Sequence, residues 1–343
     1  MKILAVESSC DESSVAFLDG RNGFTFEETI SQANLHSPYG GVVPELAANG
    51  HMESIPQLIG LWRKSCRHRP DAVAVTVGPG LVGCLAMGFA AARSLSILLG
   101  CNFFAVNHLH GHGLSPFMAP WLRGETLESY LPHIGLLASG GNSIIFRILE
   151  DWSIEVLCQT VDDAAGEALD KGAKLLGLPY PGGVEIERLS EGGNPSAFHF
   201  PVAFAANEMQ LSFSGVKTSL LYALRPMEEE EIERKKADLC ASYQAAVIGA
   251  LSKKTALGLE RFRAKSVGIS GGVSQNLLLR KEFAKLARHY GLPLLAAEKR
   301  HCGDNGAMIA FAASFSQFRM GNPGEIFPKL PMGTPSNSRK QSP

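Results

Sequence analysis

Two histidines spaced four residues apart are the residues best suited to metal chemistry. His108 and His112 lie in the run NHLHGH. If this run begins a helix, side chains at that spacing share one face, and two imidazoles on one face can bind one transition metal. His110 points elsewhere and is expected to be a bystander. The alternative is a polar helix that carries scattered histidines without a metal.

A metal at this pair needs a third ligand from a distant part of the chain. The run differs from the metalloprotease motif, in which Glu follows the first His as general base, because Leu109 stands there. His301 and Asp304 are both candidates, since both lie in one loop before an apolar segment. The residues alone leave this choice open.

Three small-residue turns that follow apolar strands are candidates for phosphate binding. They span residues 8–12, 139–142 and 271–272, with the sequences SSCDE, SGGN and GG. Small residues let the backbone approach a phosphate, and successive N–H groups form an anion-binding nest. Because tight turns also need glycine for conformational reasons, the alternative is three ordinary turns.

Carboxylates and basic clusters are less specific signals. The carboxylates of interest are Asp11, Glu12, Asp162, Asp163, Glu167 and Asp170. Asp163, Glu167 and Asp170 would share a helix face, which is also typical of a solvated surface. Lys217 could contact a phosphate or be a surface lysine. The strongest local basic cluster consists of Arg63, Lys64, Arg67, His68 and Arg69.

The elements that would position these residues suggest a duplicated α/β fold. Residues 3–18 and 134–148 both read as apolar strand, small polar turn and apolar strand. Two such hairpins, each in its own lobe, predict a duplicated fold around a cleft. The alternative is two unrelated hairpins. Helices are expected over residues 44–61, 81–99, 163–176, 228–263, 273–290 and 305–318.

Composition restricts the class of protein. The 343 residues allow one large or two medium domains, and the net charge of −1 does not indicate general attraction to nucleic acid. Seven widely spaced cysteines without a C-x-x-C motif favour a reducing, cytoplasmic setting. The N-terminus does not resemble a signal peptide. Residues 81–100 form the longest apolar stretch, which we expect to be a buried helix and not a membrane span.

Ten motifs occur in the order found in a known family. They are ESSCDESS, YGGVVPELA, GPGLVG, NHLHGH, SGGNS, DDAAGEALDK, GLPYPGG, LSFSGVKT, GGVSQN and CGDNGAMIA. Together they resemble the tRNA N6-adenosine threonylcarbamoyltransferases of bacterial type, formerly called O-sialoglycoprotein endopeptidases, over residues 1–320. The resemblance implies the duplicated α/β fold of actin, heat-shock ATPases and sugar kinases. It also implies an N-terminal lobe of residues 1–107 plus 305–325, a C-terminal lobe of residues 108–304 with the metal and adenylate site in the cleft, and a tail of residues 326–343.

The resemblance also implies site residues. One divalent metal ion, Fe²⁺ or alternatively Zn²⁺, would be held by His108, His112 and Asp304. The adenylate would lie against Leu137, Ala138, Ser139, Gly140, Gly141, Asp170, Gly183, Glu187 and Asn276. The sequence departs from the common bacterial pattern at Asn142 and Ser143, at His110 and at Asn49, and these changes concern substrate contacts.

The implied reaction transfers a threonylcarbamoyl group from threonylcarbamoyl-adenylate to N6 of adenosine 37, in tRNAs that read codons beginning with A. Asp11 or Glu12 would accept the amine proton. The implied partners are tRNA, a fold-related non-catalytic subunit and a small ATPase, with no membrane. An apolar helical surface including Leu46, Ile55 and Ile59 could dock the subunit or belong to the core. The competing interpretations are an ATP-dependent kinase, a metallopeptidase and a non-catalytic subunit of the same fold.

Overall fold

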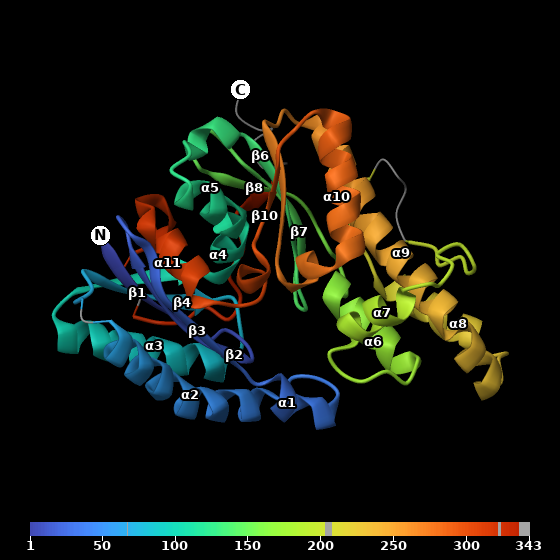
Figure 1. The fold of residues 1–343 in the computed structure, drawn as a ribbon, viewed down its shortest axis with the longest axis horizontal. Helices are drawn as coiled ribbons and strands as arrows, with labels where there is room; N and C mark the ends of the chain where they lie inside the picture. Colours follow the sequence, from blue (N-terminus) through green and yellow to red (C-terminus); the bar gives the residue numbers. More distant parts are fainter. Residues whose placement is uncertain (67, 203–207, 322–323, 336–343) are drawn as a thin grey trace. The chain divides into compact units, whose positions relative to one another are not determined.

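The computed structural model describes the chain except for residues 67, 203–207, 322–323 and 336–343 (Figure 1). These residues divide into two compact units. Unit 1 comprises Met1–Glu125 and Ala297–Met332, and unit 2 comprises Thr126–Ala296 with Gly333–Pro343. Each unit has its own six-stranded sheet and its own hydrophobic core.

Unit 1 is built around the sheet with strand order β11-β5-β4-β1-β2-β3. Its strands are β1 (Lys2–Glu7), β2 (Glu12–Asp19), β3 (Gly23–Ser31), β4 (Ala72–Gly78), β5 (Asn102–Asn107) and β11 (Arg319–Met320). Its α-helices are α1 (Ala33–His36), α2 (Pro44–Ser65), α3 (Val82–Leu99), α4 (His108–Leu114), α5 (Met118–Leu122) and α11 (Gly306–Ser314), and its 3₁₀ turns are η1 (Ser37–Tyr39), η2 (Ser115–Phe117), η5 (Lys299–His301) and η6 (Ser316–Phe318).

Unit 2 is built around the sheet with strand order β10-β9-β6-β7-β8-β12. Its strands are β6 (His133–Ala138), β7 (Ser143–Ile148), β8 (Ile154–Gln159), β9 (Ser266–Ser270), β10 (Leu294–Ala296) and β12 (Thr334–Pro335). Its α-helices are α6 (Ala165–Leu175), α7 (Gly182–Ser190), α8 (Ser214–Leu224), α9 (Glu229–Arg261) and α10 (Leu277–Tyr290), and its 3₁₀ turns are η3 (Leu127–Tyr130) and η4 (Gly272–Gln275).

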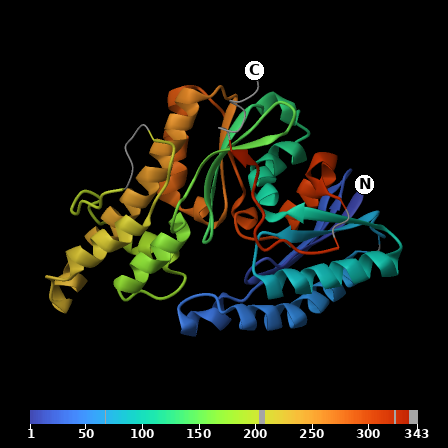
Figure 2. The same cartoon turned by 180° about the vertical axis from the view of Figure 1, so that it is seen from behind.

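The two sheets repeat one topology, as the two similar hairpins predicted. In unit 1, β1, β2 and β3 pair antiparallel, and β4 and β5 then extend the sheet in parallel from β1. In unit 2, β6, β7 and β8 pair antiparallel, and β9 and β10 extend the sheet in parallel from β6. The turn at Ser8–Glu12 therefore corresponds to the turn at Ser139–Asn142. Figure 2 shows the helical layers from the opposite side.

The units differ from the predicted lobes in one way that matters for the site. Residues 108–125 and 297–304 were expected in the C-terminal lobe, but they belong to unit 1. The cause is packing, because α11 lies against β1, β2 and α4 and holds α4 to this sheet. Two parts of the predicted tail join the units. The Phe327 N–H donates to the Val77 carbonyl at 2.6 Å, and Thr334 pairs with β8 in the sheet of unit 2. Residues 336–343 of that tail lie outside the described part.

Helix α3 is buried on one face, whereas the apolar stretch was expected to be wholly buried. Gly88 lies on the buried face and approaches Ser8 so closely that a β-carbon would clash with its side chain. Val82, Ile97 and Leu98 are exposed, the last by 81%. By length and composition, Val82–Leu99 could cross a membrane, and 28% of it is buried. One such helix is weak evidence for a membrane span, because helices of soluble proteins pass the same test.

Candidate metal and nucleotide sites

Strand and helix ends in unit 1 bring His108, His112 and Asp304 together. His108 is the first residue of α4, which begins where β5 ends, and the Asn107 side chain caps the helix by accepting the Leu109 N–H at 2.9 Å. The two imidazole rings stand 4.7 Å apart between centroids, on one face of α4. Asp304 comes from the loop before α11.

The three side chains converge on one point. The Oδ1 atom of Asp304 lies 2.9 Å from Nε2 of His112 and 3.5 Å from Nε2 of His108, and the three ligand atoms all lie within 4.8 Å of one another. Both histidines are buried. Two imidazole nitrogens and one carboxylate oxygen form a donor set that suits a divalent transition metal.

Glu7 supports this cluster from the end of β1, and the sequence reasoning missed it. The Nδ1–H of His108 donates to Oε2 of Glu7 at 3.3 Å, and Oε2 also accepts the hydroxyl of Thr76. The Ser9 N–H donates to Oε1 at 2.6 Å. A carboxylate on Nδ1 turns Nε2 toward a metal and fixes the tautomer. The sequence signal was an acidic residue at the end of an apolar strand.

The buried ionisable groups of the cluster shift one another's pKa values. Burial would lower the pKa of His108, but the carboxylates of Asp304 and Glu7 outweigh it and raise that pKa to about 9. Burial would raise the pKa values of Asp304 and Glu7, but the interaction with His108 outweighs it and lowers both. A metal would therefore have to displace a proton from His108, which is ordinary for histidine ligands.

The two other histidines considered from the sequence lie outside the cluster. The ring of His110 contacts Phe318, and its Nε2 lies 2.7 Å from the Met332 carbonyl oxygen. His301 is buried with its Nε2 2.5 Å from Oε2 of Glu27. Of the two candidates for a third ligand, the structure therefore places Asp304 at the histidine pair.

Glu12 is the first residue of β2 and interacts electrostatically with Asp304, and Asp11 precedes it in the β1–β2 turn. Burial raises the pKa of Glu12 well above its usual range, and the negative charges of Asp304 and Asp11 raise it further. Asp11 is half-buried. Burial also raises the pKa of the Cys10 thiol, so Cys10 is not an activated nucleophile.

In unit 2, the turn between β6 and β7 is closed by its own hydrogen bonds. The Ser139 N–H donates to the Asn142 carbonyl at 2.8 Å, and the Asn142 N–H donates to the Ser139 hydroxyl at 3.1 Å. A β-carbon at Gly140 or Gly141 would meet open space. The backbone of this turn is therefore accessible to a ligand.

Four close approaches join the remaining predicted adenylate residues to this turn. The Gly166 N–H donates to the Ser139 carbonyl at 3.2 Å, so α6 begins against the turn. One turn along α6, the Gly183 N–H donates to Oδ1 of Asp170 at 3.0 Å, which attaches α7. Glu187 on α7 then accepts the Leu277 N–H through Oε1 at 2.6 Å, at the start of α10.

The fourth approach closes the ring. Gly271, with φ of 84°, sits so near the Ala138 backbone that a β-carbon would clash with it. Asn276 follows on the same loop and caps α10, since its Oδ1 accepts the Leu279 N–H at 3.0 Å and its Nδ2 donates to Gln244 at 2.8 Å. All nine predicted adenylate residues thus belong to one ring of contacts in unit 2, formed by the β6–β7 turn, strand β6, helices α6 and α7, and the start of α10. This arrangement is called the ring of loops below.

Several of these side chains are buried or make hydrogen bonds within the protein. Leu137 and Ala138 are fully buried in strand β6, so only their backbone could face a ligand. Asp170 and Glu187 each accept a backbone N–H of another helix. Burial raises the pKa of Asp170. The four acidic residues noted around α6 act locally as well, because Asp162 accepts the Phe213 N–H and Lys171 pairs with Asp163 and Glu167.

Comparison with known proteins decides the family. Residues 24–311 match the model of the tRNA N6-adenosine threonylcarbamoyltransferase family. A protein of that name from Syntrophobacter fumaroxidans is 44% identical over 322 residues, which cover 91% of this chain and 93% of the relative. Another from Dictyoglomus turgidum is 38% identical over 330 residues, with 95% and 96% coverage. The chain belongs to the tRNA N6-adenosine threonylcarbamoyltransferase family.

Solved structures agree with the fold expected of this threonylcarbamoyltransferase family member. HypF of T. kodakarensis aligns with a TM-score of 0.58 at 18% identity, over 91% of this chain and 47% of the HypF chain. The activator of the 2-hydroxyisocaproyl-CoA dehydratase from Clostridium difficile aligns with a TM-score of 0.52 at 14% identity, over 91% and 94%. These likenesses confirm the duplicated α/β fold of the actin, heat-shock ATPase and sugar kinase class.

Proposed function

We propose that this chain transfers the threonylcarbamoyl group of threonylcarbamoyl-adenylate to N6 of adenosine 37, in tRNAs that read codons beginning with A. The products are N6-threonylcarbamoyladenosine and AMP. The observation that carries the proposal is the match to relatives of that name along more than nine-tenths of the chain and almost the full length of each relative. The family model matches residues 24–311 as well. Neither a kinase nor a metallopeptidase accounts for that match.

The chemistry needs an activated carbonyl, a bound leaving group and a proton acceptor. N6 of the adenine attacks the carbamoyl carbon, the bond from that carbon to the phosphate oxygen breaks, and AMP leaves with the electron pair. An exocyclic amine is a weak nucleophile, so positioning and stabilisation of developing charge must supply most of the rate enhancement. The residues of both units fit parts of this task.

His108, His112 and Asp304 would hold a divalent metal, Fe²⁺ or Zn²⁺. Such an ion, when bound, would supply Lewis-acid chemistry. The fit rests on the converging Nε2 and Oδ1 atoms and on Glu7 behind His108. The open backbone of Gly140 and Gly141 would receive the AMP phosphate, within the ring of loops that Asp170, Gly183, Glu187 and Asn276 hold in place.

Asp11 is the better proton acceptor of the two carboxylates named from the sequence. Burial raises the pKa of Glu12, and the negative charges of Asp304 and Asp11 raise it further, which disfavours the ionised form of this carboxyl group. Asp11 is half-buried in the same turn, where a substrate amine could reach it.

The partners would be tRNA, a fold-related non-catalytic subunit and a small ATPase, in the cytoplasm. Of the two alternatives for the α2 surface, Ile55 and Ile59 favour the core, because Ile55 is buried and Ile59 packs against the core of unit 1. The exposed apolar residues on α2 and α3 are Met52, Leu61, Val82, Ile97 and Leu98. This exposed set replaces the earlier one as the docking surface for the subunit.

The test is a complete transfer reaction with nucleosides read by mass spectrometry. Purified protein is mixed with unmodified tRNA, the two partner proteins, and threonylcarbamoyl-adenylate made in place from threonine, bicarbonate and ATP by its synthase. We expect N6-threonylcarbamoyladenosine only when this chain and the partners are present. No product with matched partners would contradict the enzymatic function. Multiple turnovers without partners would contradict the dependence on them.

A further inference from the structure

A chain with a net charge of −1 needs a local basic surface to bind tRNA through its phosphates. The cluster singled out at residues 63–69 is partly engaged within unit 1, although Arg63 and Lys64 are exposed. The Arg69 guanidinium donates to the Leu99 carbonyl at the end of α3, and His68 Nδ1 lies 3.3 Å from Nζ of Lys2. Arg67 lies outside the described residues. A larger group of exposed cations lies in unit 2.

Charge is strongly segregated along the chain in unit 2. Residues 253–289 contain nine lysines and arginines but only two glutamates. Residues 228–238, at the other end of α9, contain six acidic residues and three basic ones. One end of this helix is therefore acidic, while its other end and the following helix are basic.

The fold gathers the basic residues onto one surface. Helices α9 and α10 pack against each other and cover the sheet of unit 2 (Figure 1). The Tyr290 hydroxyl donates to Oε1 of Glu260 at 3.3 Å, so the two helices end side by side. The side chains exposed here form what we call the basic face: Arg261, Arg263, Lys265, Lys281, Lys285 and Arg288.

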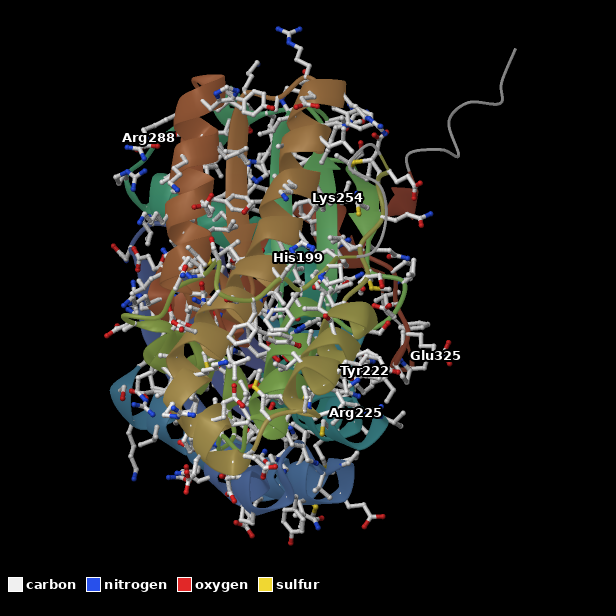
Figure 3. All side chains as sticks on the ribbon, turned by 90° about the vertical axis from the view of Figure 1, so that its right-hand side faces the viewer. His199, Tyr222, Arg225, Lys254, Arg288 and Glu325 are labelled. Carbon is white, nitrogen blue, oxygen red and sulfur yellow. The ribbon has the colours of Figure 1, made fainter. Side chains whose placement is uncertain are left out.

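Spacing along α10 shows which way its cations point. Leu279, Phe283 and Ala287 are buried against the core. Lys281, Lys285 and Arg288 follow a spacing of four and three, which places them together on the exposed side. Figure 3 shows Arg288 on the outer side of α10, directed away from the core.

Helix stability explains only part of this pattern. Basic residues in the last turn of a helix interact favourably with its dipole, which accounts for Arg261 and Arg288. Lys281 lies in the first half of α10, where that interaction is absent. Arg263 and Lys265 lie beyond the end of α9. Lys285 pairs with Glu282 at 2.7 Å. Lys281, Arg263 and Lys265 need another explanation.

We propose that the basic face of α9 and α10 binds the phosphate backbone of the tRNA substrate. The inference rests on the proposed function, because it takes tRNA as the acceptor. Cations spread over two neighbouring helices match a polyanion, and each phosphate that they neutralise releases condensed counterions. Such contacts position the tRNA without reading its sequence.

The test compares two triple variants of the full chain in the complete transfer reaction. The first, K281Q/K285Q/R288Q, removes three cations from the basic face. The matched control, R225Q/R234Q/K235Q, removes three exposed cations near the acidic end of α9, so both variants change net charge equally. Melting temperatures verify that each is folded. KM for tRNA, kcat, and tRNA binding at several salt concentrations are measured for both.

We expect the basic-face variant to raise KM for tRNA at least about tenfold with kcat retained. The slope of log affinity against log salt should fall by about 2–3, roughly one for each lost phosphate contact. The control should behave like the original protein. If both variants match the original, or if the control loses as much as the first variant, the basic face is not the tRNA surface. Absence of product from the original protein would instead overturn the proposed function.

Discussion

The cluster in unit 1 and the ring of loops in unit 2 depend on different parts of the polypeptide. In unit 1, the identity of buried side chains matters, since His108, His112 and Asp304 offer ligand atoms and Glu7 orients one of them. In unit 2, the exposed backbone of Gly140 and Gly141 is expected to contact the ligand. Substitutions in unit 1 should therefore act by removing a metal ligand or its support. Substitutions in unit 2 should act by filling the space that a bound phosphate needs.

The largest effect is expected from Asp304→Ala. Loss of a ligand should lower bound metal and reduce transfer by more than about 100-fold, the upper end of what outer-shell changes cause. Metal analysis of protein purified without chelators or a metal column, together with the nucleoside assay, measures both. His110→Ala is the control, because His110 bonds to the Met332 carbonyl and not to Asp304. Full metal occupancy in the Asp304 variant would remove this residue from the site.

Gly141→Val should lower affinity for AMP by roughly 10- to 100-fold, the loss expected when hydrogen bonds to a charged group are blocked. A side chain at position 141 meets open space in the protein, so the melting temperature should stay unchanged while a bound phosphate would be crowded. Isothermal calorimetry with AMP measures this. A matched change, Gly177→Asn, lies at another glycine with open space around it, and its φ of 70° suits Asn. Unchanged AMP affinity in Gly141→Val would contradict the anion nest.

Glu7→Gln should weaken metal binding by about tenfold and leave the fold intact. Glutamine keeps a hydrogen-bond acceptor near Nδ1 of His108 but removes the charge that fixes the ligand. Competition with a chelator gives the dissociation constant directly. Glu12→Gln is the control, because it makes the same change in a neighbouring acid whose side chain bonds to Asp11. Equal metal affinity in the Glu7 variant and the original protein would show that Glu7 does not orient His108.

The smallest effect concerns the stability of the metal-free protein. The folded pKa of His108 is raised to about 9 from an ordinary 6.5, so its contribution is fully present below pH 6.5 and is lost as pH rises through 9. The free energy of unfolding should therefore fall as pH rises over that interval. Urea unfolding after chelator treatment, compared with His108→Gln, isolates this residue. An equal pH dependence in both proteins would contradict the assignment.

Local patterns predicted much of the fold and the histidine pair. The two hairpins and the four-residue spacing of His108 and His112 are short-range features that a sequence displays directly. Tertiary contacts decided the rest. Asp304 and His301 share one loop, and only packing directs one to the histidines and the other to Glu27.

Glu7 shows most clearly why the sequence was insufficient. It lies 101 residues from His108, and no spacing rule joins an acid at the end of a strand to a histidine at the start of a helix. The exposed face of α3 was missed for a related reason. Apolar residues all around a helix predict full burial, but the sequence does not reveal how many neighbours the helix has.

The most direct test compares one variant of each region in the same pair of measurements. Metal content and AMP affinity are determined side by side for Asp304→Ala and Gly141→Val. We predict that Asp304→Ala loses metal but binds AMP normally. Gly141→Val should keep its metal but lose AMP affinity. Both variants should fail in the transfer reaction. Loss of metal and AMP binding together in either folded variant would contradict the division of the chemistry between the side chains of unit 1 and the backbone of unit 2.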